Sequence, residues 1–212
     1  MPSRRVGRTA DVRQRSVFLN VPFDRAYEPL FVALIAGLTI LGLRPRCVLE
    51  IAERGEGRLQ RIVTLLRLCQ VSIHDLSRVQ SSMINGRRVP RFNMPFELGQ
   101  AVMLRVFQPH DVHVLESTPH RLALSVSDLG GIDPLIHGNN PKTLSRRLLG
   151  TFDRTDRQPT LAELESVRSE LFRVAQSYRR HHRMATILEP DGFHILTSAA
   201  SDISAELGLI AR

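Results

Sequence analysis

The feature that most constrains the fold of this chain is the alternation of short apolar segments with longer stretches of helical spacing. Strands are predicted at residues 16–19, 46–50 and 71–75, with a fourth at 112–115. The segments between them have the apolar spacing of helices and cover residues 27–41, 59–69 and 95–107. Three strand–helix units in succession predict an α/β fold, in which a parallel sheet carries helices on both faces.

The predicted order of these elements also indicates where a ligand would bind. In a doubly wound parallel sheet, ligands bind beyond the carboxyl ends of the strands, where the strand order reverses. For a flavodoxin-like strand order, that point lies between the first and third strands, whose ends carry residues 20–24 and 74–78. The helix containing Glu97 follows the third strand. We therefore expect these three segments to border one pocket.

The remainder of the chain divides into two parts around this domain. Residues 1–15 are basic and poor in apolar side chains, which predicts a flexible arm, and residues 16–152 form the α/β domain. Residues 153–212 are predicted to be a helical extension that packs on the domain or on a partner. In it, Thr160 and Glu163 form a capping-box pattern that opens a helix to about residue 183, and a short last helix is expected at 201–210.

Segments outside these regular elements are less clearly patterned. Residues 76–92 are predicted to form a long polar loop, and residues 120–136 are ambiguous. Asn140 followed by proline is typical of a helix start, and that helix is expected to run to about residue 149.

Composition limits the environment and the partners. The net charge is +8, and Lys142 is the only lysine, so arginine supplies the positive charge, which favours an anionic partner. The apolar run 30–43 is shorter than the roughly 20 residues that a membrane-spanning helix needs. No signal-peptide pattern opens the chain, and Cys47 and Cys69 are expected to be buried thiols in a reducing compartment. We therefore expect a cytoplasmic protein without membrane contact, metal site or cofactor.

The expected pocket has the groups that a glycosyl transfer requires. Glu97, Asp75 and Asp24 are carboxylates, of which one would attack or stabilise an anomeric carbon while another protonates the departing group. Tyr27 would orient Glu97 through a hydrogen bond. Each residue also has a structural alternative, since Glu97 would complement the helix dipole, Asp75 would close a turn and Tyr27 would pack in the core.

The substrate-binding groups are expected to come from the same segments. A flat heterocycle would lie between two apolar side chains while amides read its edge and an arginine meets a phosphate. The residues proposed for this are Asn20, Pro22, Phe23, Asp24, Arg78, Asn93 and Met94. Phe23 has the alternative of being a core residue.

Three motifs together resemble the nucleoside 2-deoxyribosyltransferase-like group, which is related to TIR-like flavodoxin folds. They are VFLNVPFDRAYEPLF, SIHDLSR and RFNMPFELGQA, within residues 16–107. The resemblance implies that Glu97 is the nucleophile, since residues 96–101 match the group's F-E-x-G-x-A helix start. It also implies that Asp75 is the acid near the leaving base and that Tyr27 orients the nucleophile. The segment before Glu97 and the arginine-rich loop depart from the group's pattern.

The first functional hypothesis is therefore an N-glycosidic-bond transferase or hydrolase that acts on a nucleoside, nucleotide or NAD through Glu97. By analogy, the resemblance also suggests a bacterial anti-phage effector. One alternative is a nucleotide-binding or scaffold module without turnover, and another is a nucleic-acid-binding accessory protein. A homo-oligomer is expected, and a complex with another protein or with nucleic acid is left open.

Overall fold

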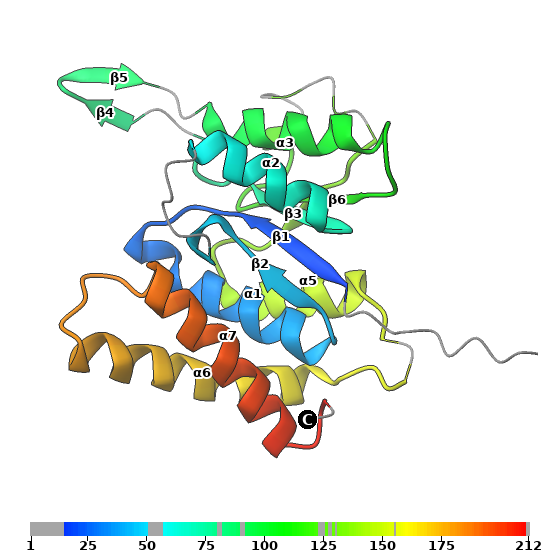
Figure 1. The fold of residues 1–212 in the computed structure, drawn as a ribbon, viewed down its shortest axis with the longest axis vertical. Helices are drawn as coiled ribbons and strands as arrows, with labels where there is room; N and C mark the ends of the chain where they lie inside the picture. Colours follow the sequence, from blue (N-terminus) through cyan, green and yellow to red (C-terminus); the bar gives the residue numbers. More distant parts are fainter. Residues whose placement is uncertain are drawn as a thin grey trace, which may run out of the picture.

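A five-stranded, all-parallel sheet forms the centre of the computed structural model, in the order β2-β1-β3-β6-β7 (Figure 1). The structure describes residues 15–50, 57–79, 82–89, 92–122, 126, 129, 131–154 and 156–210. The all-parallel sheet, with helices on both faces, confirms the predicted flavodoxin-like α/β fold. The strands are β1 (Ser16–Asn20), β2 (Arg44–Arg46), β3 (Val71–Asp75), β6 (Asp111–Glu116) and β7 (Leu135–Ile136).

The helices form layers on both sides of this sheet, as Figure 1 shows. One face is covered by α2 and α3, and the other by α1 and α5, with α6 and α7 outside α1. Their bounds are α1 (Glu28–Ile40), α2 (Arg58–Leu68), α3 (Asn93–Leu104), α5 (Pro141–Thr151), α6 (Leu161–His181) and α7 (Pro190–Glu206). Short 3-10 turns occur at Arg25–Tyr27 and Val48–Glu50.

Helix α1 is buried on all sides because it lies between the sheet and the outer pair of helices. All its residues from Leu30 to Ile40 are buried, which explains an apolar run that has no polar face. Gly37 lets α5 approach closely, since a Cβ at this position would lie 2.6 Å from Leu148 Cδ1. In the part of the chain that is described, no helix has both the length and the apolar character needed to cross a membrane.

The C-terminal helices pack on α1 and share its core. Leu164, Val167 and Leu171 of α6 are buried in this core, together with Phe193 and Leu196 of α7. The buried apolar residues of α6 therefore pack against α1.

Polar contacts support this packing. The buried carboxylate of Glu28, at the start of α1, accepts hydrogen bonds from Arg179 Nη1 and Ile187 N, each at 3.0 Å. The capping box of Thr160 and Glu163 is present as predicted. The capping box satisfies backbone N–H groups at the start of α6, and the ion pair of Arg179 joins the last turn of α6 to α1.

Two predicted elements are wrong in position. The second strand lies at Arg44–Arg46, and part of the predicted segment 46–50 is a 3-10 turn. Pro45 is tolerated because β2 is an edge strand, where a missing N–H costs little. The last helix begins at Pro190, earlier than the predicted residue 201. Proline is favourable in the first turn of a helix, and Gly192 is needed in this turn because a Cβ there would overlap the Ile187 carbonyl.

Two segments that were predicted as irregular contain strands. The predicted loop 76–92 includes a hairpin of β4 (Ser82–Ile84) and β5 (Arg87–Val89), which projects from the body in Figure 1. Its turn residues Asn85 and Gly86 both have positive φ, as an Asn-Gly hairpin turn requires. In the ambiguous segment 120–136, β7 adds a fifth strand to the sheet.

Candidate functional site

The carboxylate of Glu97 lies in a small pocket at the carboxyl ends of β1 and β3. The pocket has a volume of about 250 Å³. Predicted site residues from two of the expected segments line it, namely Asn20, Pro22, Phe23, Asp24, Asn93, Met94 and Glu97. Val21 and Arg58 complete the lining. Two of the three segments expected at this pocket therefore meet here, whereas no residue of the third segment, 74–78, lines it.

The position of Glu97 in its helix differs from the prediction. Helix α3 begins at Asn93, so Pro95 is its third residue and Glu97 lies beyond the first turn. Phe92 is the N-cap of this helix and makes no side-chain capping bond. The helix-dipole effect falls off within the first turn, so it gives a weaker reason for a glutamate at position 97.

The environment of Glu97 favours its neutral form. The residue is only 5% exposed, and its nearest ion-pair contact is Arg58, whose Nη2 lies 4.0 Å from Oε1. Burial raises the pKa of Glu97 to about 7, although the positive charge of Arg58 opposes this shift. At neutral pH the carboxyl group is thus close to half ionised, a property that is frequent in catalytic carboxylates.

Asn20 joins the end of β1 to the start of α3 beside this carboxyl group. Its amide nitrogen contacts His74 Nδ1 at 3.0 Å and donates to the Met94 carbonyl at 3.3 Å. With both amide hydrogens engaged, Oδ1 is the Asn20 atom that can accept a bond from a ligand. His74 is fully buried, and burial together with nearby His110 lowers its pKa to about 3, so it is a neutral hydrogen-bond partner.

The turn after β1 provides the opposite wall of the pocket. Asp24 Oδ1 accepts a hydrogen bond from Tyr27 N at 3.1 Å, and Oδ2 lies 3.7 Å from Arg78 Nε. The Phe23 ring packs edge-on against Phe31 with a centroid distance of 6.3 Å. Phe23 therefore lines the pocket and is also fixed by the core. Arg78 contacts this wall through Asp24 without lining the pocket.

Asp75 belongs to a separate, buried hydrogen-bond network. Tyr27 Oη donates to Oδ2 at 2.5 Å, and Ser77 donates to Oδ1 from its backbone N at 2.8 Å and its Oγ at 2.5 Å. His137 Nε2 lies 3.1 Å from Oδ2. His137 Nδ1 accepts a bond from Asn139 N at 3.0 Å, so the proton of the neutral ring sits on Nε2, which lies beside Asp75 without the geometry of a hydrogen bond.

This network gives Asp75 and Tyr27 structural roles. Burial alone would raise the pKa of Asp75, but its contacts with His137, Ser77 and Tyr27 outweigh burial and leave the pKa below its usual value. Burial, followed by the Asp75 charge, raises the pKa of Tyr27 well above its usual value, so Tyr27 remains a donor. Its hydroxyl group binds Asp75 rather than Glu97, and neither residue lines the Glu97 pocket.

Three residues of these clusters were missed by the sequence reasoning. His137 follows β7, which had no clear pattern. Ser77 stands two residues after Asp75, the spacing at which an aspartate binds backbone and hydroxyl groups of a turn, so a local signal was present. Arg58 opens α2, and nothing in its sequence context indicated that this helix start would reach Glu97.

No metal site or reactive thiol is evident in the part of the chain that the structure describes. No cluster of three or more His, Cys, Asp or Glu side chains there could hold a metal ion. Cys47 and Cys69 are buried and free, and burial raises the pKa of each thiol to about 12. Their thiolates are therefore scarce at neutral pH.

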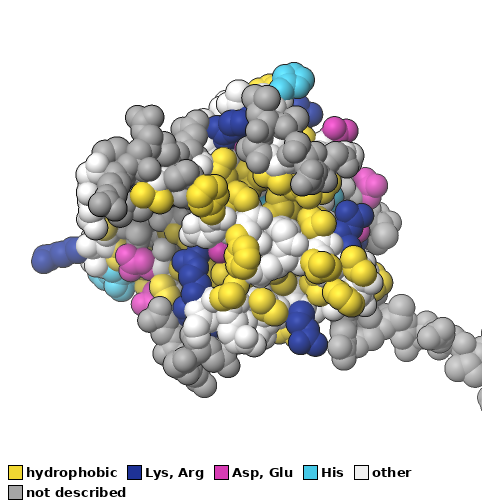
Figure 2. All heavy atoms as spheres, turned by 90° about the horizontal axis from the view of Figure 1, so that it is seen from above, with side chains coloured by type: hydrophobic (Ala, Val, Ile, Leu, Met, Phe, Trp, Pro, Cys, Tyr) yellow, Lys and Arg dark blue, Asp and Glu magenta, His cyan; other side chains and the backbone are white. Residues whose placement is uncertain are grey.

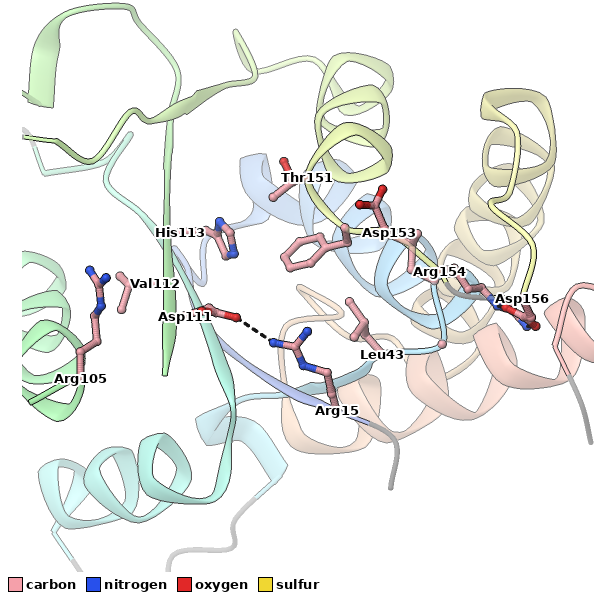
Figure 3. Close-up of a pocket in the computed structure, with 13 residues that line it drawn as sticks. Arg15, Leu43, Arg105, Asp111, Val112, His113, Thr151, Asp153, Arg154 and Asp156 are labelled. Carbon is pink, nitrogen blue, oxygen red and sulfur yellow. Dashed lines mark hydrogen bonds and ion pairs between the residues drawn. The ribbon is translucent and has the colours of Figure 1, made fainter. Parts of the chain in front are cut away.

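A larger pocket of about 860 Å³ lies at the amino ends of the strands (Figure 3). Two of its arginines have internal partners, and Arg15 Nη2 donates to Asp111 Oδ2 at 2.7 Å. Arg154 donates to the carbonyl groups of Ile40 and Leu209, which ties α1 to the end of the chain. These contacts hold elements together, and the Glu97 pocket remains the better candidate site.

Comparison with known proteins finds no similar family or protein. No protein-family model matches the chain, and no curated protein or solved structure matches it. The resemblance to nucleoside 2-deoxyribosyltransferases therefore stays a prediction.

Proposed function

We propose that the Glu97 pocket cleaves or transfers the N-glycosidic bond of a nucleoside, a nucleotide or NAD. The observation that carries this proposal is a nearly buried carboxyl group with a pKa of about 7, facing a small pocket. An electron-poor anomeric carbon accepts an ionised glutamate as nucleophile, and this pKa leaves about half of the Glu97 side chains ionised at pH 7.

The lining of the pocket supports a ligand with a flat base and a sugar. Phe23 and Met94 provide apolar surface for a base, and Asn20 Oδ1 is available to accept a bond from its edge. Arg58 lies at the mouth with an exposed guanidinium group, which suits a phosphate or another anionic group of the substrate. A nucleoside or mononucleotide fits these features.

The proposed reaction proceeds through a covalent intermediate on Glu97. The ionised carboxylate forms a bond to the anomeric carbon while the carbon–nitrogen bond breaks, and the base leaves with the electron pair. The base of a nucleoside or nucleotide then takes up a proton from solvent, whereas the nicotinamide of NAD leaves as a neutral base and takes up none. Water, or a second base, then attacks the anomeric carbon and releases Glu97. With water as acceptor, the products are the free base and the free sugar.

Asp24 is our candidate for the second carboxylate in place of Asp75. It lines the pocket and is partly exposed, whereas Asp75 is buried and engaged by Tyr27, Ser77 and His137. An ionised Asp24 can accept the proton of the water that resolves the intermediate. Asp75 would act on Asp24 indirectly, because Tyr27 binds Asp75 through its hydroxyl group and Asp24 through its backbone N–H.

The test is chromatography for free base after incubation of the full chain with a panel of nucleosides, nucleotides and NAD. Glu97→Gln should abolish base release, while Glu206→Gln, which changes an exposed glutamate at the end of α7, should leave it unchanged. Arg58→Ala should raise KM for phosphorylated substrates more than for nucleosides. Base release that persists in folded Glu97→Gln would refute the proposal.

A nucleotide-binding module without turnover is the second candidate. One contact favours it, since the Tyr27 hydroxyl donates to Asp75 and therefore does not orient Glu97. Equilibrium dialysis with the same panel distinguishes the two functions. Ligand that binds tightly and is recovered intact after hours supports the binding module, and recovery of free base supports the enzyme.

A further inference from the structure

The outer face of α2 and α3 exposes large apolar side chains, in contrast to the opposite face of the sheet, which two layers of helices cover. Phe96 and Met103 are each 58% exposed and Phe107 is 78% exposed. Figure 2 shows apolar side chains gathered on this face, with basic side chains at its margin. The three side chains together expose roughly 400 Å², which is within the range of the largest apolar patches on monomers.

These side chains border a groove between the two helices. It has a volume of about 520 Å³, and Val63 and Leu104 contribute to its apolar walls. Gly99 lies in the groove, and a Cβ built there would meet no atom within 4 Å. The surface is therefore hollow along α3, with a shape that can receive side chains from one face of another helix.

Among the described residues of α2 and α3, the exposed charged side chains near this groove are basic. Arg67 lines it, and Arg58 is exposed at the start of α2. Within α2 and α3, all of whose residues are described, the only carboxylate is Glu97, which is buried, lines its own pocket and does not line the groove. An acidic partner therefore meets complementary charge here.

We propose that this groove is a docking site for an amphipathic helix of a partner protein, with an apolar stripe flanked by acidic residues. Apolar residues at positions i, i+4 and i+7 of the partner would lie against Phe96, Met103 and Phe107, and its acidic residues would lie near Arg67.

The charge and shape argue against other occupants. A second copy pairing through the same groove would bring together two faces that both carry exposed arginines and no exposed carboxylate on α2 or α3, without complementary charge. A membrane surface favours a convex apolar face, whereas this one is hollowed at Gly99.

The probe is a fluorescein-labelled helical peptide of about four turns, with leucine at i, i+4, i+7 and i+11 and glutamate at the flanking positions. A matched peptide carries lysine in place of each glutamate. Fluorescence anisotropy with the full chain should show saturable binding of the acidic peptide and at least roughly tenfold weaker binding of the basic one.

Two variants of the chain test the groove itself. Gly99→Leu fills the hollow in a helical position where leucine is favourable, and it should weaken the acidic peptide at least roughly tenfold while circular dichroism shows a folded chain. Arg67→Glu should weaken the acidic peptide and strengthen the basic one. Arg146→Glu makes the same charge change on α5, across the sheet, and should alter neither affinity more than about twofold.

Several outcomes would overturn the proposal. They are equal binding of the two peptides, absence of binding to either, and an acidic-peptide affinity that Gly99→Leu leaves unchanged. Sedimentation that shows a wild-type dimer dissociated by Gly99→Leu would instead assign the groove to a second copy. Flotation with phosphatidylserine vesicles that depends on Phe107 would assign it to a membrane.

Discussion

Replacement of Glu97 by glutamine should stabilise the protein, with a pH dependence that follows from the pKa of this residue. The unfolded chain releases the Glu97 proton near pH 4.5, whereas the folded protein releases it near pH 7. Between these values the folded state binds more protons, so the stability of the wild type falls as pH rises. From the difference in pKa, the ionised carboxylate costs the fold about 3 kcal/mol at pH 8 and less than about 1 kcal/mol at pH 5. Glutamine has nearly the same shape and carries no charge, so it avoids this cost.

Urea unfolding of wild type and Glu97→Gln at the two pH values measures the effect. The variant should exceed the wild type in free energy of unfolding by about 3 kcal/mol at pH 8, with little difference at pH 5 and unchanged m-values. Glu206→Gln, an exposed change of the same type, should show no such divergence. A difference that is equal at both pH values would mean that Glu97 is not a desolvated carboxylate, and the proposed function would lose its main support.

Three further substitutions test the structural assignments, each by urea unfolding. Asp75→Asn should lose about 3 kcal/mol at pH 7, because removal of one partner leaves a buried polar network unsatisfied. The Asp75 pKa is lowered, so the stabilisation it provides is present above about pH 4 and is lost as pH falls further, and the deficit of the variant should shrink there. If this variant kept full stability but lost base release, Asp75 would be an acid after all. Gly37→Val should cost about 1–3 kcal/mol, since its side chain would crowd Leu148, and equal stability would contradict the close helix packing. Thr160→Ala should cost about 1 kcal/mol through loss of the cap to Glu163 N, and a neutral effect would show that the cap does not stabilise α6.

The pocket could be predicted from the sequence because it depends on topology and local pattern. Alternation of strands and helices places the carboxyl ends of β1 and β3 side by side, and the residues after each strand follow directly. Asn20 and Phe23 reach the pocket for this reason. Glu97 reaches the pocket because α3 packs over the same strand ends. The position of Glu97 within the helix differs from the prediction because α3 begins at residue 93, two residues earlier than predicted.

The errors come from contacts that local pattern does not encode. His137 contacts Asp75 across a long sequence distance, and β7, which precedes it, is too short to give a periodic signal. The predicted strand at 46–50 excludes Pro45, because the tolerance of a proline inside β2 depends on the edge position of that strand, which the local sequence does not show. Pro190 and Gly192 have low helix propensity, so the local sequence did not predict the start of α7 there. In the structure, tertiary packing against Ile187 outweighs this low propensity.

The separation of Asp75 from Glu97 follows from the geometry of a single strand. Successive side chains of β3 point to opposite faces of the sheet, so His74 contacts Asn20 beneath α3 while Asp75 contacts Tyr27 beside α1. Residues adjacent in sequence thus serve two different clusters, one around the pocket and one within the fold. Residues that are close together in the motif SIHDLSR therefore need not belong to the same site. For a motif at the end of a buried strand, one must first establish which face of the sheet each side chain points to before assigning it a catalytic role.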